Sequence, residues 1–305
     1  MSFDSETDNK RRNYKKYIIG ILLAAFISPI LFEATASSQP LPISTSSTEK
    51  IRTHTEFILE QNPNETKRIK RKTGKKTPKA TKVDMSWTKM QQRFPGAFVM
   101  NGPRNKRQVA LTFDDAPDPR FTPAILDVLA KYDVCATFFI VGNRAVKHPE
   151  LVRRINREGH TIGNHSYNHE VMSLLSNGDF HQQIARTDEI ISRIIGYHPR
   201  FIRPPYGEML PAQVAWTKKT GYIVVNWDVD SVDWRNNPSS NNILFNIKRN
   251  LQSGSIVLQH AGGGEGQDLS GTVQALPRLI SLLRQKGYDL VTLPELLGQS
   301  PSKTK

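Results

Sequence analysis

Cysteine is almost absent from this chain. Cys135 is the only cysteine among 305 residues, so no disulfide can form within the chain. Small extracellular folds that depend on disulfides are therefore excluded, and a hydrophobic core must stabilise the protein instead. No cysteine closely follows the apolar run near the N-terminus, which excludes a lipid-modified cysteine anchor there. Cys135 lies in the apolar run 134–141, where we expect it to be a small, buried core residue.

Acidic residues are too few to balance the basic ones. The chain has 42 lysines and arginines against 28 aspartates and glutamates, which gives a net charge of +14. The most basic stretch, residues 67–82, contains nine lysines and arginines and no acidic residue. It lies within residues 37–84, a Ser-, Thr-, Lys- and Pro-rich segment that we interpret as a disordered basic linker. The basic stretch could bind anionic wall polymers or lipid headgroups, or it could be a solvated spacer.

Long hydrophobic runs are rare, and the one near the N-terminus predicts export. Residues 17–32 are mostly apolar, follow five lysines and arginines, and precede an Ala-Thr-Ala sequence that ends at Ala36. This order is typical of a signal peptide, which we place at residues 1–36. The run is shorter than the roughly 20 residues of a membrane span, and Pro29 interrupts it. An uncleaved membrane anchor remains the alternative, and in either case the basic flank predicts an exported remainder.

Two further absences restrict the class of function. Export without disulfides is typical of a bacterial surface protein, and export argues against nucleic acid as a partner of the basic linker. The Gly-rich stretch 262–266 lacks the Gly-Lys-Ser/Thr sequence of a phosphate-binding loop, so we expect a flexible loop there.

The periodicity of the remaining chain predicts an α/β fold. Residues 85–104 form a lead-in segment, and residues 105–298 form the folded domain. Short apolar runs predict strands over 108–113, 134–141, 160–164, 200–203, 222–227, 255–259 and 288–292. Amphipathic stretches predict helices near 121–132, 149–158, 179–195, 211–220, 241–252 and 272–286. This alternation favours a parallel sheet and predicts a distorted (β/α)7-8 TIM-like barrel.

Polar residues follow the predicted strands at one end. They lie at or just past the C-terminal end of a strand, and they are Asp114, His165, Arg203, Asp230 and His260. Active sites of β/α barrels assemble at this rim. The sequence therefore predicts that residues far apart in the chain form one site there.

Two short clusters within this set predict a metal site. Asp114 and Asp115 close an apolar run and are expected to put one carboxylate on each side of the strand end. His165 and His169 are spaced to present both imidazoles on one face of a helical turn. Each cluster alone has an ordinary explanation, a solvated turn or unrelated histidines. Together, three of the groups could bind a divalent metal, and the fourth could be a catalytic base.

Three more motifs carry candidate residues. They are Arg203-Pro-Pro-Tyr-Gly, Asp230-Ser-Val-Asp-Trp and Ile256-Val-Leu-Gln-His. Taken singly, Arg203 could make a surface ion pair, Asp233 could be a turn residue, and His260 could be a core histidine. In this order and together with the first two clusters, the five motifs resemble the polysaccharide deacetylase family, the NodB homology domain of carbohydrate esterase family 4. The resemblance covers roughly residues 105–296.

The resemblance implies a metal centre and a base. Asp115, His165 and His169 match the ligands of one divalent metal ion, usually Zn²⁺, although other divalent transition metals are possible. Asp114 resembles the catalytic base, and Arg203 resembles the cation that keeps the base ionised.

The resemblance also implies the rest of the site. Tyr206 matches a substrate-binding residue whose backbone N–H stabilises the oxyanion, and Trp234 resembles a wall of the sugar pocket. His260 resembles the general acid, which Asp233 orients. The family commonly has glycine where this chain has Ala116, which would disturb the Asp pair only if that position needed a positive φ.

The function implied is removal of N-acetyl groups from amino-sugar polymers of the cell wall. Among the members of the family, the sequence is most like bacterial peptidoglycan N-acetylglucosamine deacetylases. Chitooligosaccharides, N-acetylmuramic acid and O-acetyl-xylan are alternative substrates, and a weakly catalytic or non-catalytic polysaccharide-binding protein is the alternative of another class. The expected location is the bacterial cell surface, anchored in the membrane, associated with the wall or secreted.

Overall fold

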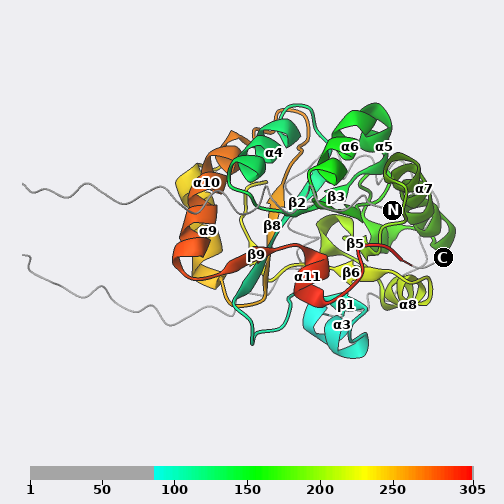
Figure 1. The fold of residues 1–305 in the computed structure, drawn as a ribbon. Coiled ribbons are helices and arrows are strands. Elements are labelled where there is room, and N and C mark those ends of the chain that lie inside the picture. Colours follow the sequence, from blue (N-terminus) through cyan, green and yellow to red (C-terminus); the bar gives the residue numbers. More distant parts are fainter. Residues whose placement is uncertain (1–85, 304–305) are drawn as a thin grey trace, which may run out of the picture. The chain divides into compact units, whose positions relative to one another are not determined.

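The computed structural model describes residues 86–303, which are drawn as ribbon in Figure 1. The predicted signal or anchor segment and the basic linker lie outside these residues. Within the described part of the chain, no helix is both long and apolar enough to cross a membrane.

The core of the fold is one sheet of nine strands. All strand pairs in it are parallel. The strands are β1 (Phe98–Val99), β2 (Gln108–Ala116), β3 (Thr137–Ile140), β4 (Thr161–Asn164), β5 (Phe201–Ile202), β6 (Ile223–Val225), β7 (Val229–Asp230), β8 (Ser255–His260) and β9 (Asp289–Val291).

The sheet curls into an incompletely closed barrel. Its strand order is β1-β6-β5-β4-β3-β2-β8-β7, and β9 pairs with the first half of β2. Strands β1 and β7 end the series, and an isolated bridge between Asn101 and Ser255 connects the chain after β1 to β8. The predicted distorted α/β barrel is therefore confirmed, with closure by a single bridge instead of a continuous strand pair.

Helices flank this sheet, and most of them cover its outer face. They are α3 (Trp87–Arg93), α4 (Thr122–Lys131), α5 (Gly142–Lys147), α6 (Pro149–Arg157), α7 (Asn177–Ile195), α8 (Pro211–Lys219), α9 (Ser240–Asn250), α10 (Ser270–Gln285) and α11 (Leu293–Leu297). Two 3₁₀ turns, η1 (Met172–Leu174) and η2 (Pro205–Gly207), lie between them. Neighbouring helices pack in the order α9, α10, α4, α6 and α7, an arrangement that can be followed in Figure 1.

Helix α7 shows how local sequence sets an element that the site needs. It begins after Ser176, whose hydroxyl accepts a hydrogen bond from the Asp179 N–H at 3.2 Å, and it ends at Gly196 with φ 87°. Serine is common at the residue before a helix begins, and glycine is common where a helix ends. The helix in turn holds the end of β4, because Asn164 Nδ2 donates to the Ile184 carbonyl at 3.0 Å.

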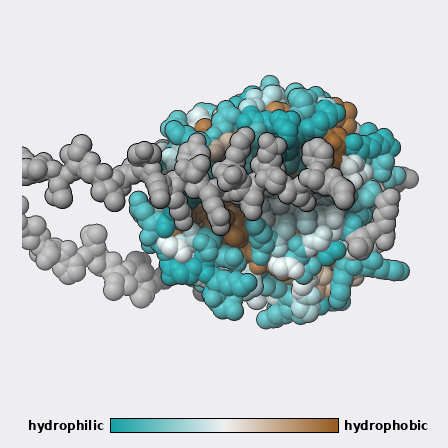
Figure 2. Space-filling model, in the orientation of Figure 1, coloured by the Kyte–Doolittle hydropathy of each residue, from teal (hydrophilic) through white to brown (hydrophobic). Residues whose placement is uncertain are grey.

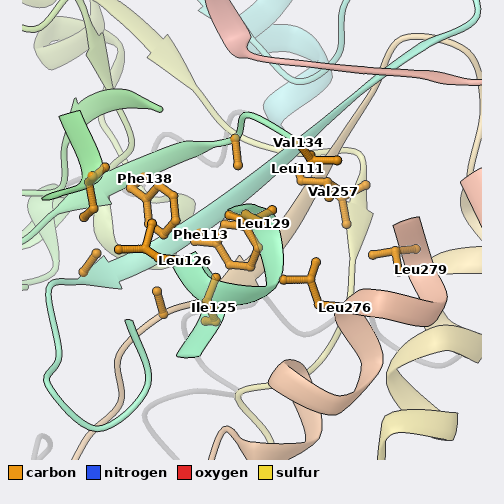
Figure 3. Packing of buried hydrophobic residues seen from close by; sticks show 14 of the residues in the cluster. Leu111, Phe113, Ile125, Leu126, Leu129, Val134, Phe138, Val257, Leu276 and Leu279 are labelled. Carbon is orange, nitrogen blue, oxygen red and sulfur yellow. The ribbon is translucent and has the colours of Figure 1, made fainter. Parts of the chain in front are cut away.

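Successive side chains of β2 point alternately to the apolar core outside the sheet and to the site inside the barrel. Leu111 and Phe113 point into a large apolar cluster between the sheet and its helices, where Phe113 stacks on Phe138 with 5.1 Å between ring centroids. Figure 3 shows these rings beside side chains of α4 and α10. Thr112 and Asp114 alternate with them and therefore lie on the opposite face, toward the inside of the barrel.

The inside of the barrel is packed below the site. Residues such as Ala110, Phe139 and Leu258 form an apolar cluster there, and Leu293 and Leu296 of α11 join it. Buried layers of this kind are typical of β/α barrels, whose interior is a core and not a pore. The polar residues of the site therefore lie over an apolar floor.

The described surface is mainly hydrophilic on the face shown in Figure 2. Four large apolar side chains are exposed in the described residues, and they are Val146, Leu174, Leu210 and Phe245. Singly exposed apolar side chains of this kind are normal for a folded domain.

Cys135 is not the buried core residue that the sequence predicts. Its neighbours Val134 and Ala136 are buried, but the Cys135 side chain is exposed, just before β3 begins. Alternation in an extended segment puts successive side chains on opposite faces, which explains the difference. Partial burial, together with the nearby charges of Glu295 and Asp133, raises the pKa of this thiol.

Several short elements were absent from the sequence-based prediction. Strands β1 and β7 have two residues each, and helices α5 and α11 have six and five residues. Periodicity over so few residues cannot be distinguished from a loop. Their positions are set by pairing with strands that are distant in the sequence.

Replacement of a buried ring should show how much the apolar cluster between the sheet and its helices contributes to the free energy of unfolding. We expect Phe138→Ala to lower the free energy of unfolding by about 3–5 kcal/mol, because the ring is fully buried and its loss leaves a cavity. Phe245→Ala is the matched control, since that ring is 65% exposed, and it should change stability by about 0.5 kcal/mol or less. Denaturant midpoints measure both, and equal losses would contradict this core assignment.

Candidate active site

The end of β2 places two carboxylates in one site. Asp114 and Asp115 were expected on opposite sides of the strand, but both face the same imidazole. His165 Nε2 lies 3.8 Å from Asp114 Oδ2 and 3.6 Å from Asp115 Oδ1. The reason is an irregularity in the pairing of β2 with β3 between Phe113 and Ala116, where Asp115 has φ 64°. Such a bulge turns a side chain away from its regular face.

The two histidines lie in a loop and not on a helical turn. The chain leaves β4 at Asn164, and Ser166 and His169 both have positive φ angles, 65° and 60°. Side-chain hydrogen bonds stabilise this path. Ser166 N donates to Asn164 Oδ1 at 3.0 Å, and His169 N donates to Ser166 Oγ at 2.9 Å. The loop brings the two imidazoles together, with 5.0 Å between ring centroids.

Asp115, His165 and His169 form a group that could hold a metal ion. Their ligand atoms all lie within 4.8 Å of one another, and His169 Nε2 lies 3.3 Å from Asp115 Oδ1. Asp115 Oδ1 is buried and has no hydrogen-bond partner. His165 Nδ1 is 2.7 Å from the Arg203 carbonyl oxygen, an arrangement that leaves Nε2 for a ligand bond. The residues therefore fit a divalent metal with nitrogen and oxygen ligands.

The electrostatics keep Asp115 and His165 in the protonation states that a metal requires. Burial alone would raise the pKa of Asp115, but the charges of the two histidines and Arg144 outweigh it, and the pKa falls to about 2. Burial lowers the pKa of His165 to about 4, against the opposing charges of Asp114 and Asp115. At neutral pH the carboxylate is thus ionised and the imidazole neutral.

Arg203 is a fully buried cation beside Asp114. Its Nη1 donates to Asp114 Oδ1 and to Thr112 Oγ1, each at 2.8 Å. Its other nitrogens donate to the carbonyl oxygens of Val225 and Asn226, at 3.0 and 3.2 Å. A surface ion pair is therefore excluded for Arg203, and the pair with Asp114 is shielded from solvent.

His260 and Asp233 form a second polar pair. Asp233 Oδ1 lies 2.7 Å from His260 Nδ1, and its Oδ2 accepts hydrogen bonds from the His260 backbone N–H at 2.9 Å and from Thr272 Oγ1 at 2.8 Å. Burial would lower the pKa of His260, but the charge and hydrogen bond of Asp233 outweigh it and raise the pKa to about 9. His260 is therefore an imidazolium at neutral pH, with Nε2 as a second donor.

Tyr206 and Trp234 lie at the rim with partly buried side chains. Tyr206 has φ 60° and its ring packs edge-on against His169, with 4.9 Å between centroids. The Trp234 carbonyl oxygen accepts a hydrogen bond from Gln267 Nε2 at 3.3 Å. Asp230 ends β7, and its Oδ1 accepts the Val232 N–H at 2.7 Å.

Ala116 does not disturb the neighbouring acids. It is fully buried and pairs with Ile140 of β3. Ala116 is not among the residues with positive φ, whereas Asp115 is. A glycine is therefore not required at this position.

Sequence reasoning missed three residues that support the site. Thr112 binds Arg203, Thr272 binds Asp233, and Arg144 Nη1 donates to the Asp115 carbonyl oxygen at 2.8 Å. Alternation along β2 could have indicated Thr112, because it lies two residues before Asp114. No local pattern marks Thr272 or Arg144, since tertiary packing alone brings them to the site.

Comparison with known proteins places this geometry in a family. Residues 101–225 match the family model described as polysaccharide deacetylase. A peptidoglycan-N-acetylglucosamine deacetylase of Bacillus cereus is 44% identical over 218 residues, which cover 72% of this chain and 78% of that protein. The peptidoglycan-N-acetylmuramic acid deacetylase PdaC of Bacillus subtilis is 35% identical over 215 residues, covering 68% of this chain and 44% of that protein.

Solved structures agree with these matches. The structure of a peptidoglycan N-acetylglucosamine deacetylase in complex with a naphthalenyl N-oxidanyl-benzamide superimposes with a TM-score of 0.68 at 44% identity, covering 71% of this chain and all of that one. A protein of Bacillus anthracis described as a CE4 family pseudoenzyme superimposes with a TM-score of 0.62 at 30% identity, covering 67% of this chain and 70% of that one.

Removal of one predicted ligand should weaken metal binding. We expect the protein to bind one Zn²⁺ per chain, and Asp115→Asn to weaken that binding at least about 10-fold, because an ionised oxygen ligand is lost. Asp127→Asn, which replaces an exposed aspartate of α4, is the matched control and should bind as the unaltered protein does. Isothermal titration with Zn²⁺ measures all three, and unchanged affinity in Asp115→Asn would contradict the assigned site.

Proposed function

Because this chain belongs to the polysaccharide deacetylase family and is a hydrolase of carbohydrate esterase family 4, we propose that it deacetylates N-acetylglucosamine residues of cell-wall peptidoglycan. We further propose that it depends on one divalent metal ion, with Zn²⁺ as the first candidate. The observation that carries the proposal is the convergence of three possible metal ligands, a carboxylate on a buried arginine, and a protonated histidine at one rim of the barrel.

The metal would be held by Asp115, His165 and His169. When bound, a divalent metal supplies a Lewis acid that polarises the acetyl carbonyl and makes a water molecule more acidic. An amide needs this help because it is a poor electrophile with a poor leaving group. The remaining steps fall to side chains and backbone groups of this chain.

Asp114 is the proposed base. Its Oδ1 is held by Arg203 and its Oδ2 faces His165 Nε2, so the carboxylate is fixed beside the ligand group. It accepts a proton from the attacking water as the new carbon–oxygen bond forms. Arg203 contributes by holding the carboxylate in one orientation, through the hydrogen bond from its Nη1 to Asp114 Oδ1 at 2.8 Å.

The oxyanion and the sugar need their own contacts. We assign the backbone N–H of Tyr206 to the oxyanion, where such a donor contributes on the order of 3 kcal/mol to the transition state. Tyr206 lies against His169, so its backbone belongs to the same rim as the ligand group. Trp234 is the proposed apolar wall for the sugar ring.

His260 is the proposed acid. Its pKa of about 9 keeps it protonated at neutral pH, and Asp233 fixes the ring through Nδ1. Nε2 can then donate a proton to the departing amine, which could not leave as an anion. Base and acid thus come from different strands, β2 and β8, whose ends are adjacent in the sheet.

The choice of peptidoglycan is supported by relatives and by the sequence of the N-terminal part. The two relatives named above act on peptidoglycan according to their names, one on N-acetylglucosamine and one on N-acetylmuramic acid. We propose an exported protein at the bacterial cell surface, retained through residues 17–32 if they are not cleaved. Residues 67–82 would bind anionic wall polymers or lipid headgroups.

Acetate release tests the proposed reaction. We expect the full chain to release acetate from purified peptidoglycan, a chelator to stop the release, and Zn²⁺ to restore it. Asp114→Asn should lower the turnover about 10²–10⁴-fold, because a general base typically contributes that much. Asp127→Asn should retain activity.

The same assay separates the rival functions. Acetate release from chitooligosaccharides or acetylated xylan but not from peptidoglycan would contradict the proposed substrate, while the proposed mechanism would stand. If no polymer releases acetate while polymer binding persists, the chain is a non-catalytic binding protein; the family also contains a protein described as a pseudoenzyme.

The pH dependence should report the state of His260. Because the acid must be protonated, activity should persist through neutral pH and fall as the pH rises through about 9. Asp233→Asn removes the charge that raises this pKa while the burial that lowers it remains, so the fall should move to lower pH. Thr272→Val removes only one hydrogen bond to Asp233 and should shift the pH at which activity falls much less. Identical profiles for the three proteins would exclude His260 as the acid.

A further inference from the structure

The Gly-rich loop after β8, residues 262–266, is hydrogen-bonded to the turn at Asp115, a proposed metal ligand. It was expected to be flexible, but its backbone is held on both sides. Gly263 N donates to Asp118 Oδ2 at 3.2 Å, and the Gly263 carbonyl oxygen accepts from Arg120 Nη2 at 2.9 Å and Arg144 Nη2 at 3.0 Å. Gln267 closes the far side, where it accepts the N–H of Gly264 at 3.0 Å. The loop is thus part of the site's framework.

Arg144 is the side chain that bonds both the Asp115 backbone and the Gly-rich loop, beside the contacts that Asp118 and Arg120 make to Gly263. It comes from α5, and its Nη1 donates to the Asp115 carbonyl oxygen at 2.8 Å while its Nη2 donates to Gly263. Asp118 Oδ2 lies 3.6 Å from Nη1 and balances the charge. One planar guanidinium therefore spans the turn of a proposed metal ligand and the loop that follows the proposed acid, His260.

The contact leaves no spare room. A Cβ atom built on Gly262 would lie 2.3 Å from Arg144 Nη1 and 2.3 Å from the Asp115 carbonyl oxygen. Only glycine therefore lets the loop come this close. Asp115 itself has φ 64°, a conformation that costs a non-glycine residue about 1–3 kcal/mol and persists only where its surroundings hold it.

We propose that Arg144 is a positioning residue that fixes the Asp115 turn relative to the loop after His260. It sets the separation between the metal ligands and the acid without touching substrate itself. The inference rests on the proposed function, because the roles of Asp115 and His260 come from it. Lysine could not replace arginine fully, since a single ammonium lacks the fork that reaches two carbonyl oxygens.

Three variants of the full chain test the inference. Arg144→Met removes the fork, Arg144→Lys retains only the charge, and Arg154→Met is the control, an arginine of similar exposure on α6 that bonds only Glu158 and Asp127. We expect Arg144→Met to weaken Zn²⁺ binding and to lower kcat, each about 10- to 100-fold, with KM nearly unchanged. Arg144→Lys should recover part of both losses, and Arg154→Met should show neither.

A second substitution perturbs the same contact with Arg144 intact. Gly262→Ala should push the loop away and reproduce the Arg144→Met losses. Amide hydrogen exchange of residues 261–267 in the metal-free protein gives a readout independent of catalysis, and it should become faster in Arg144→Met and Gly262→Ala but not in Arg154→Met.

The outcomes separate this inference from the proposed function. Unchanged Zn²⁺ affinity, kcat and loop exchange in Arg144→Met, with an active unaltered protein, would overturn the positioning role and leave the deacetylase proposal standing. An unaltered protein that neither binds Zn²⁺ nor releases acetate would overturn the proposed function. Loop exchange would then still decide whether Arg144 holds the two segments together.

Discussion

The buried ion pair between Arg203 and Asp114 is the interaction on which the site depends. Arg203 follows β5, is fully buried and bonds the ends of two other strands, through Asp114 of β2 and the carbonyl oxygens of Val225 and Asn226 in and after β6. Its own carbonyl oxygen holds His165. A buried charge without its partner costs about 3–5 kcal/mol, so neither member can be lost without disturbing the whole rim.

Around this pair, the site is built from backbone in uncommon conformations. Asp115, Ser166, His169 and Tyr206 all have φ near 60°. Residues of this kind cost free energy and cluster where function requires a particular direction of a side chain or N–H. Here they turn the carboxylate of Asp115 back toward the histidines and bring His169 beside His165. The barrel below supplies the rigidity, because its interior is filled with apolar side chains.

Most of the regular structure could be predicted from periodicity, whereas the local geometry of the site could not. Within residues 86–303, seven of the nine strands and six of the helices lie where the apolar runs and amphipathic stretches indicated. The exposure of Cys135, the common direction of the two Asp carboxylates and the loop path between the two histidines differed from expectation. Each difference arises in a short segment, where the face that a side chain occupies depends on the conformation of a few residues, by regular alternation at Cys135 and by positive φ angles at Asp115, Ser166 and His169.

The sequence by itself determined the fold class, the family and the identity of the residues at the rim, because strand ends, spacing and residue chemistry are local properties that can be read along the chain. Only the tertiary structure decided how these residues meet. It paired Arg203 with Asp114, Asp233 with His260, and Arg144 with the turn at Asp115. These contacts join residues that lie 27 to 89 positions apart, and their geometry depends on strand order and on strained turns that no local pattern encodes.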